Sequence, residues 1–220
     1  MGARVKVATG QASAVSRLDR RKARTRQALI DAAVRLLAAG RGEHASIQEI
    51  TEAADVGFGS FYNHFPSKED LFEAASLEVL ERLGQMIDRA CAGLSDPAEV
   101  LAVSFRISAR LAWTHPEIAQ FLTGAGLDLL DAPNGLAPRA LRDIKAGQAA
   151  GRFVIPSAHV ALAAVAGDLL GLLWLRQRHP DRIDEASVDQ LTEAILRLLG
   201  LTTREARRLA TRPLPATSDW

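Results

Sequence analysis

The chain has little of the chemistry that marks disulfide-rich, metal-binding or catalytic proteins. It has one cysteine, Cys91, which excludes an internal disulfide and a cysteine-based zinc cluster and fits a reducing compartment. None of its five histidines forms an i, i+4 pair, so a helical metal site has no support. No nucleophile with a base, paired acids or phosphate loop occurs at a usable spacing. We therefore expect neither an enzyme nor a protein with a metal or cofactor.

Aromatic residues are also scarce, at 5%, and no long stretch has the pattern of a strand. The chain is 48% hydrophobic and rich in alanine and leucine, which favours an all-α fold. The most apolar run, Val160 to Leu175, is too short for a membrane span and contains Asp168, so we expect a buried helix. The N-terminus lacks the apolar core of a secretory signal. These features predict a cytoplasmic protein without a membrane partner.

Net charge is only +1, but its distribution is uneven. The first 26 residues carry eight basic residues against a single acidic one, Asp19. A basic segment of this kind is the electrostatic footprint expected for binding to a polyanion such as nucleic acid. The same charge can also serve solubility alone.

Residues 46 to 72 read as two short helices joined by a turn, followed by a third helix. Ser46 and Glu49 form a capping box, so a helix should begin at Ile47. Asp55 tolerates the left-handed conformation that ends this helix, and Gly57 is acceptable at the start of the next. In that second helix Phe61 and Phe65 are spaced i, i+4 and should face inward. Their neighbours are then turned outward, namely Ser60, Tyr62, Asn63 and His64.

Pro66 should stop the second helix, and Ser67 should cap a long third one. Lys68 then lies at the positive end of that helix, where a phosphate is favoured. Phe58 is the unusual member of the segment, because an apolar ring there is either half-buried or directed at a thymine methyl group. The sequence leaves both interpretations open.

This segment resembles the DNA-binding domain of the tetracycline-repressor (TetR) family of bacterial regulators. The resemblance rests on an ordered run of six residues: Gly59, Tyr62, Phe65, Pro66, Lys68 and Leu71. The family usually has glycine where this chain has Asp55, serine or threonine at Gly57, and often lysine at Phe58. These departures mean that base contacts cannot be copied from the family.

The resemblance implies particular roles for these positions. Tyr62, His64 and Lys68 would hold phosphates, as would the first helix through Arg24, Thr25 and Arg26. The residues expected to approach the bases are Phe58, Gly59, Ser60 and Asn63, and Ser46 and Gly57 complete the predicted DNA-contacting set.

Helical periodicity and breakers divide the chain into four parts. These are a disordered basic arm (1–19), a helix-turn-helix domain (20–66), a helical ligand-binding and dimerisation domain (67–200) and a polar tail with no assigned role (201–220). The helix from Lys68 to about Ala92 is long enough to belong to both domains. A looser zone rich in glycine and proline lies between residues 124 and 138.

A small-molecule site is plausible in the second domain. Arg106, Arg110 and Trp113 share a helix face and could offer an anion two cations and a ring. The alternative is a surface stripe paired with acids on the preceding helix. Other candidate ligand contacts, which are equally compatible with plain core packing, are Met86, Phe105, Phe121, Leu122 and Trp174; Asp168 should find a partner in the cavity or across a dimer.

The last two apolar helices are too hydrophobic for a monomer surface. In proteins that the chain resembles, the corresponding pair forms a four-helix dimer interface. The predicted interface residues are Leu162, Val165, Leu169, Leu173, Leu191, Ile195 and Leu198.

Together these features predict a homodimeric transcriptional regulator that binds double-stranded DNA at a roughly palindromic operator. The expected activity is repression relieved by a small-molecule effector. Two alternatives remain: an activator or ligand-independent regulator of the same fold, and a helical ligand-binding protein without DNA-binding activity.

Overall fold

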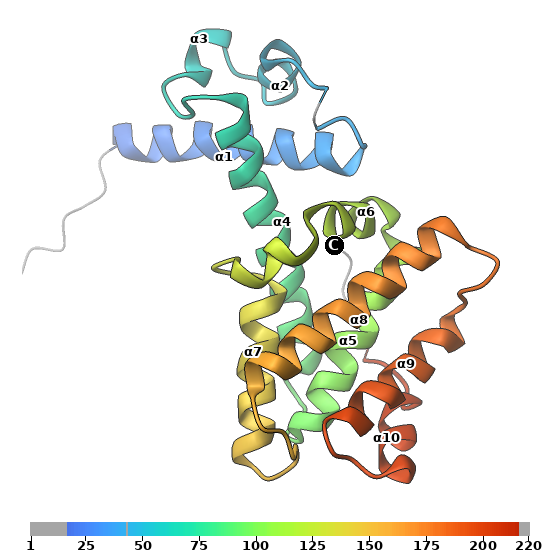
Figure 1. Ribbon diagram of the computed structural model, residues 1–220. Helices are drawn as coiled ribbons and strands as arrows, with labels where there is room; N and C mark the ends of the chain where they lie inside the picture. Colours follow the sequence, from blue (N-terminus) through green and yellow to red (C-terminus); the bar gives the residue numbers. More distant parts are fainter. Residues whose placement is uncertain (1–16, 43, 216–220) are drawn as a thin grey trace, which may run out of the picture.

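The computed structural model describes residues 17–42 and 44–215, and the regular structure in this part of the chain is all helical, as the sequence predicted (Figure 1). Most of the predicted basic arm lies outside the described residues. The helices are α1 (Arg17–Ala38), α2 (Ile47–Ala53), α3 (Phe58–Phe61), α4 (Lys68–Cys91), α5 (Pro97–Thr114), α6 (Pro116–Ala125), the 3₁₀ helix η1 (Gly126–Asp131), α7 (Leu136–Ala149), α8 (Ala158–Arg178), α9 (Glu185–Leu198) and α10 (Thr203–Ala210).

Helices α1 to α3 and the first turns of α4 form an N-terminal head. Its core contains Leu29, Ile50, Phe61, Phe65 and Leu71, all buried. Fully burying a side chain of this size contributes about 1.5–3 kcal/mol, so this cluster can hold the short helices α2 and α3, which would not be stable alone. The capping box at the start of α2 is present, with Ser46 Oγ accepting from the Glu49 amide.

Helix α4 connects the head to the C-terminal body (Figure 1). Its 24 residues span roughly 36 Å at 1.5 Å per residue. Leu71 and Ala75 belong to the core of the head, whereas Leu83 and Ile87 belong to the core of the body. Helix α4 is therefore shared by the head and the body.

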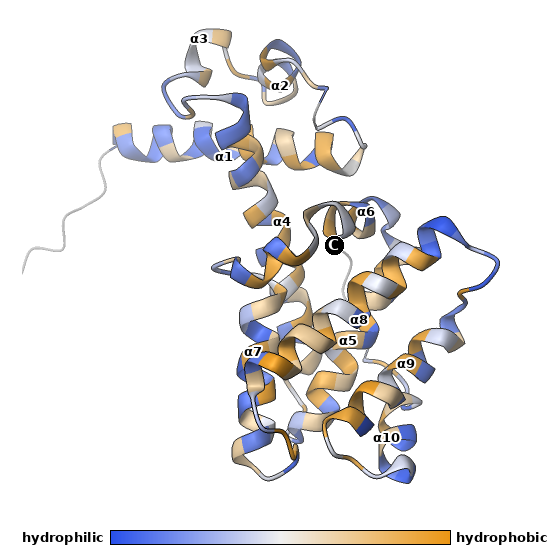
Figure 2. Cartoon of the chain, viewed as in Figure 1, coloured by the Kyte–Doolittle hydropathy of each residue, from blue (hydrophilic) through white to orange (hydrophobic). Residues whose placement is uncertain are grey.

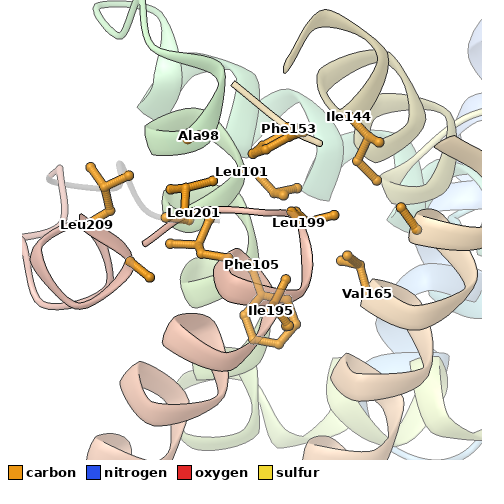
Figure 3. Packing of buried hydrophobic residues seen from close by; sticks show 14 of the residues in the cluster. Ala98, Leu101, Phe105, Ile144, Phe153, Val165, Ile195, Leu199, Leu201 and Leu209 are labelled. Atoms are coloured by element: carbon orange, nitrogen blue, oxygen red, sulfur yellow. The ribbon is translucent and has the colours of Figure 1, made fainter. Parts of the chain in front are cut away.

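The body packs α5 at its centre, between α4 and α6 on one side and α8, α9 and α10 on the other. Figure 3 shows a cluster of buried hydrophobic residues in the body, where Leu101 and Phe105 of α5 meet Val165 of α8 and Ile195 of α9. Figure 2 shows that α8 is largely apolar, whereas much of α1 is hydrophilic. The cluster holds α7 in place through Ile144.

The C-terminal segment has a structural role that the sequence did not predict. Within the predicted tail, Thr203–Ala210 form α10, and Ala206, Leu209 and Ala210 are buried. Arg152 ties α10 to the start of α5, because its guanidinium contacts Asp96 at 2.8 Å and Glu205 at 2.8 Å. The segment up to α10 is therefore part of the body.

Candidate DNA interface and ligand cavity

The turn between α2 and α3 places one face of α3 in solvent. Asp55 adopts a positive φ of 54°, the left-handed conformation predicted for it. Phe61 and Phe65 are buried as expected, and this orientation leaves Phe58 54% and Tyr62 57% exposed. The Phe58 ring meets Tyr62 edge to face, with ring centroids 6.3 Å apart. Phe58 therefore projects outward instead of packing in the head core.

The remaining polar residues of the predicted DNA-contacting set surround these two rings. Gly59 and Asn63 are exposed, Ser60 is partly exposed within α3, and His64 is partly exposed on the turn that follows Phe61. Gly57 is the N-cap of α3, and Ser46 is engaged in capping α2, which leaves its hydroxyl committed to Glu49. The exposed side chains on one face thus offer two rings and an amide to the groove of a duplex.

Basic groups flank this face. Arg24 is exposed and Thr25 is partly exposed on α1, and Arg26 lies over the Phe65 ring, with 4.9 Å between its guanidinium carbon and the ring centroid. Lys68 is the first residue of α4, directly after the capping Ser67. Arg17, Arg20 and Arg21 extend the basic surface along α1, so phosphates on either side of a groove would meet positive charge.

The body contains a cavity of about 90 Å³, surrounded by α4, α5, η1, α7 and α8. Most of its wall is apolar. The apolar contributors are Ile87, Leu101, Phe105, Leu122, Leu129, Leu130, Leu136, Ala137, Ala140, Leu162, Val165, Ala166, Leu169 and Leu170.

Charged residues form one end of the cavity, although their polar atoms contribute only a small part of its surface. Asp88 of α4 and Arg139, Arg142 and Asp143 of α7 meet there, with Ser104 and Ser108 of α5 nearby. Asp88 accepts from Arg139 Nε at 2.7 Å and from Arg142 Nη2 at 3.0 Å, and Arg142 Nε contacts Asp143 at 2.7 Å. Hydrogen bonds to the two arginines outweigh the effect of burial and lower the pKa of Asp88. The polar end therefore presents carboxylates and guanidinium groups beside an apolar slot.

Arg139 also contacts a residue outside the cavity lining. Its two terminal nitrogens bind both carboxylate oxygens of Glu81, at 3.0 and 2.9 Å. The hydrogen bonds from Arg139 lower the pKa of Glu81 to about 2.

The predicted ligand contacts are mostly elsewhere. Among those predicted, only Phe105 and Leu122 line this cavity. Met86 is in the core of the body, Phe121 lines clefts next to α1, and Trp174 is exposed. Arg176 covers Trp113, with its guanidinium carbon 4.9 Å from the ring centroid.

Arg106 is only 4% exposed and is occupied by the protein itself. Its Nε donates to Asp189 at 2.9 Å and its Nη1 to the carbonyl of Arg212 at 2.6 Å. Arg110 contacts Asp189 at 3.2 Å and Glu185 at 3.3 Å. The acids that pair with these arginines therefore lie on α9, and not on the preceding helix α4 as the alternative interpretation expected, while a ligand role for the pair stays a prediction.

Sequence reasoning missed the six polar residues of the cavity. The available signal was the triplet Arg139, Arg142 and Asp143, which places charges on one face of α7 at i, i+3, i+4. That signal does not identify Asp88, which is 51 residues away from Arg139.

The predicted interface set also needs correction. Leu162, Val165, Leu173 and Ile195 are buried inside the protomer, so they cannot form a contact surface, and Leu162, Val165 and Leu169 line the cavity. Leu191 is half-buried and Leu198 is 56% exposed. The exposed stripe of α8 is instead made of Val160, Ala163, Gly167, Gly171, Trp174 and Leu175.

Asp168 lies at the edge of this stripe, in a groove between α8 and α9. Burial raises the pKa of its carboxyl group. Within residues 17–42 and 44–215, Asp168 has no ion-pair or hydrogen-bonding partner. In the part of the chain that the structure describes, α8 is also the single helix long and apolar enough to cross a membrane, a test that core helices of soluble proteins also pass.

Comparisons with known proteins agree with this architecture. Residues 29–75 match the family described as "Bacterial regulatory proteins, tetR family", and residues 96–212 match "Tetracyclin repressor-like, C-terminal domain". Among curated proteins, the nicotine-responsive transcriptional repressor HdnoR of Paenarthrobacter nicotinovorans is 33% identical over 93 residues. The match covers 42% of this chain and 44% of HdnoR, so it spans less than half of that relative.

Solved structures extend the similarity over nearly the whole chain. RolR in complex with resorcinol is 33% identical, with a TM-score of 0.73, and the alignment covers 90% of this chain and 99% of RolR. RolR without ligand gives a TM-score of 0.71 at 33% identity, covering 86% of this chain and 98% of RolR. The fatty acid degradation regulator FadR from Bacillus halodurans is 21% identical, with a TM-score of 0.63 and coverage of 78% and 94%, and shares the fold.

Proposed function

The chain belongs to the tetracycline-repressor family of bacterial regulators, and from this membership we propose that it is a dimeric repressor released from its operator by a small hydroxylated aromatic molecule. The observation that carries the proposal is the cavity, in which an apolar slot ends in a cluster of two carboxylates and two guanidinium groups. Regulators of this family bind DNA operators and small ligands, so the protein is a cytoplasmic DNA-binding regulator.

The walls and the polar end of the cavity restrict the ligand. An apolar ring can pack against the leucine-rich wall. Hydroxyl groups can donate to Asp88 or Asp143 and accept from Arg139 or Arg142, all of which line the polar end. Resorcinol, which is bound by RolR, has both features and is the natural first probe.

The DNA contacts are proposed for the exposed face of α3. Phe58, Ser60 and Asn63 would approach base edges, and Tyr62, His64 and Lys68 would position phosphates. Helix α1 would add charge through its exposed arginines. Because phosphate contacts dominate affinity, binding should weaken steeply as salt increases.

The dimer is proposed through the exposed stripe of α8 and the adjoining face of α9, where Gln190, Ala194, Arg197 and Leu198 are exposed. Glycine and alanine at four-residue spacing allow two helices to approach closely, and Trp174, Leu175 and Leu198 supply apolar area. Two heads related by a two-fold axis would enter successive major grooves, which requires half-sites about 34–36 Å or a multiple apart.

Calorimetry with resorcinol and with m-xylene tests the ligand class. The two molecules share a ring and a substitution pattern, but m-xylene has no hydroxyl groups. We expect resorcinol to bind at least ten times more tightly, because m-xylene cannot form hydrogen bonds with the polar end. Equal binding, or binding of m-xylene alone, would contradict the proposed role of the polar end.

Selection from random double-stranded DNA tests the operator. We expect enrichment of a sequence with two-fold symmetry, which resorcinol should release in a fluorescence anisotropy titration. Recovery of DNA that is retained more tightly with resorcinol would indicate a ligand-recruited regulator instead. No enrichment at low salt would favour a ligand-binding protein without DNA-binding activity.

A further inference from the structure

Arg139 belongs to the cavity and to the helix that carries the head. Arg139 lines the cavity, and its guanidinium binds two acids of α4 that are seven residues apart, Glu81 and Asp88. Seven residues are two helical turns, so one side chain of α7 holds a length of α4 of about 10 Å. The Nη1 group also donates to the carbonyl of Gly135, at the start of α7, at 3.0 Å.

Gly84 makes this contact possible. It lies between Glu81 and Asp88 on α4, and a Cβ at this position would collide with the guanidinium group of Arg139. Because Gly84 has no side chain, the planar group lies directly against α4. Glycine inside a helix costs about 1 kcal/mol relative to alanine, and the fit with Arg139 gives this residue a structural reason.

The same stretch of α4 is tied to the head. Arg82, next to Glu81, binds Asp31 of α1 at 2.6 Å and Glu78 of α4 at 2.8 Å. These contacts form a continuous path from the cavity, through Arg139 and Glu81, to the first helix of the head. The pairs Arg139–Glu81 and Arg82–Asp31 each have donor and acceptor within 3.0 Å, and the backbone of α4 joins Glu81 to Arg82.

We propose that Arg139 positions α4 in the empty protein, and that a ligand at the polar end of the cavity loosens the hold of Arg139 on Glu81 and frees the head. The inference rests on the proposed function, since it assigns the regulation of the same cavity. A ligand hydroxyl that accepts from Arg139 or donates to Asp88 competes with bonds that these groups now make to each other. The guanidinium then shifts toward the ligand, and its bidentate contact with Glu81 weakens.

The substitution Glu81→Gln tests this role without altering the cavity lining, because Glu81 is not part of it. Glu205→Gln is the matched control. Both carboxylates have 30% side-chain exposure and bind a partly buried arginine, at 2.9 Å for Glu81 and 2.8 Å for Glu205, but Glu205 lies on α10. Circular dichroism should confirm that both variants are folded.

Hydrogen exchange of the full-length protein without ligand is the first measurement. We expect amides of residues 79–87 in E81Q to exchange at least three times faster than in the wild type, and those in E205Q to be unchanged. Unchanged exchange in E81Q would overturn the proposal, whether or not resorcinol binds. Equal acceleration in both variants would also overturn it, because the effect would then be general destabilisation.

Resorcinol binding and operator release form the second measurement. We expect calorimetry to give a dissociation constant for E81Q within threefold of the wild type, while the resorcinol-induced loss of affinity for the selected operator falls at least fivefold. A tenfold weaker affinity for resorcinol in E81Q would make Glu81 a binding residue and contradict its positioning role. If resorcinol fails to bind the wild type, the proposed ligand class is wrong, and the exchange experiment still decides the role of Arg139.

Discussion

Replacement of Arg106 by methionine separates a structural ion pair from a ligand site. The guanidinium is buried and donates to Asp189 and to the carbonyl of Arg212, so it joins α5 to α9 and to the segment after α10. Methionine keeps the apolar stem and removes the charge and both hydrogen bonds. Burial lowers the pKa of Arg106, which means that the loss of hydration offsets part of the stabilisation from its two hydrogen bonds.

The magnitude follows from what the change leaves behind. Removing one partner of a buried pair costs about 3–5 kcal/mol when the other charge becomes isolated. Asp189 retains Arg110 at 3.2 Å and is 25% exposed, so its charge is not isolated. The carbonyl of Arg212 loses a bond from a charged donor, worth about 1.5–3 kcal/mol. We therefore expect Arg106→Met to cost about 2–3 kcal/mol.

Thermal unfolding at a fixed protein concentration measures this loss. For a chain of this length each kcal/mol shifts Tm by about 2–4 °C, so a decrease of roughly 4–12 °C is expected. Arg110→Met is the matched control, with an expected cost below about 1 kcal/mol. Its guanidinium has 20% side-chain exposure, and among the described residues its Nη1 atom has no hydrogen-bonding partner. Equal shifts for the two variants would refute the reasoning.

Three further predictions concern DNA binding and pH. Lys68→Ala should weaken binding to all DNA sequences alike and lower the slope of log affinity against log salt by about one. Asn63→Ala should instead change the sequence preference. If the preference is unchanged in a competition assay, other residues read the bases. The pKa of Glu81 is lowered from 4.5 to about 2, so its contribution to stability is complete above about pH 4.5 and declines as pH falls toward 2. The Tm difference between wild type and Glu81→Gln should accordingly shrink by roughly half between pH 7 and pH 3, and a constant difference would contradict the ion-pair explanation. Burial raises the pKa of Asp168, which means that the charged carboxylate lowers the stability of the folded protein at pH 7. Asp168→Asn should therefore raise Tm at pH 7 and have no effect below pH 3.8, the ordinary pKa of this group. A lower Tm at pH 7 would reveal a partner across the dimer.

The sequence by itself determined where α2 and α4 begin and how the turn between α2 and α3 is made, although α3 ends at Phe61 and not at Pro66 as predicted. The caps at Ser46 and Ser67 and the left-handed Asp55 depend on hydrogen bonds and steric limits within about four residues. The spacing of Phe61 and Phe65 fixed which face of α3 is buried, and therefore that Tyr62 is exposed. Such features can be predicted because all their determinants are neighbours in the chain.

Only the tertiary structure decided which charges meet and which apolar faces are covered. Arg139 pairs with residues 51 and 58 positions away, and Arg106 with one 83 positions away, at distances set by the packing of α4, α7 and α9 around α5. The periodicity of α8 marked Leu162 and Leu173 as apolar, but that pattern is the same whether a face is buried in its own protomer or against another. The polar end of the cavity exists because α4 and α7 bring their charged residues together, and no local pattern encodes that meeting.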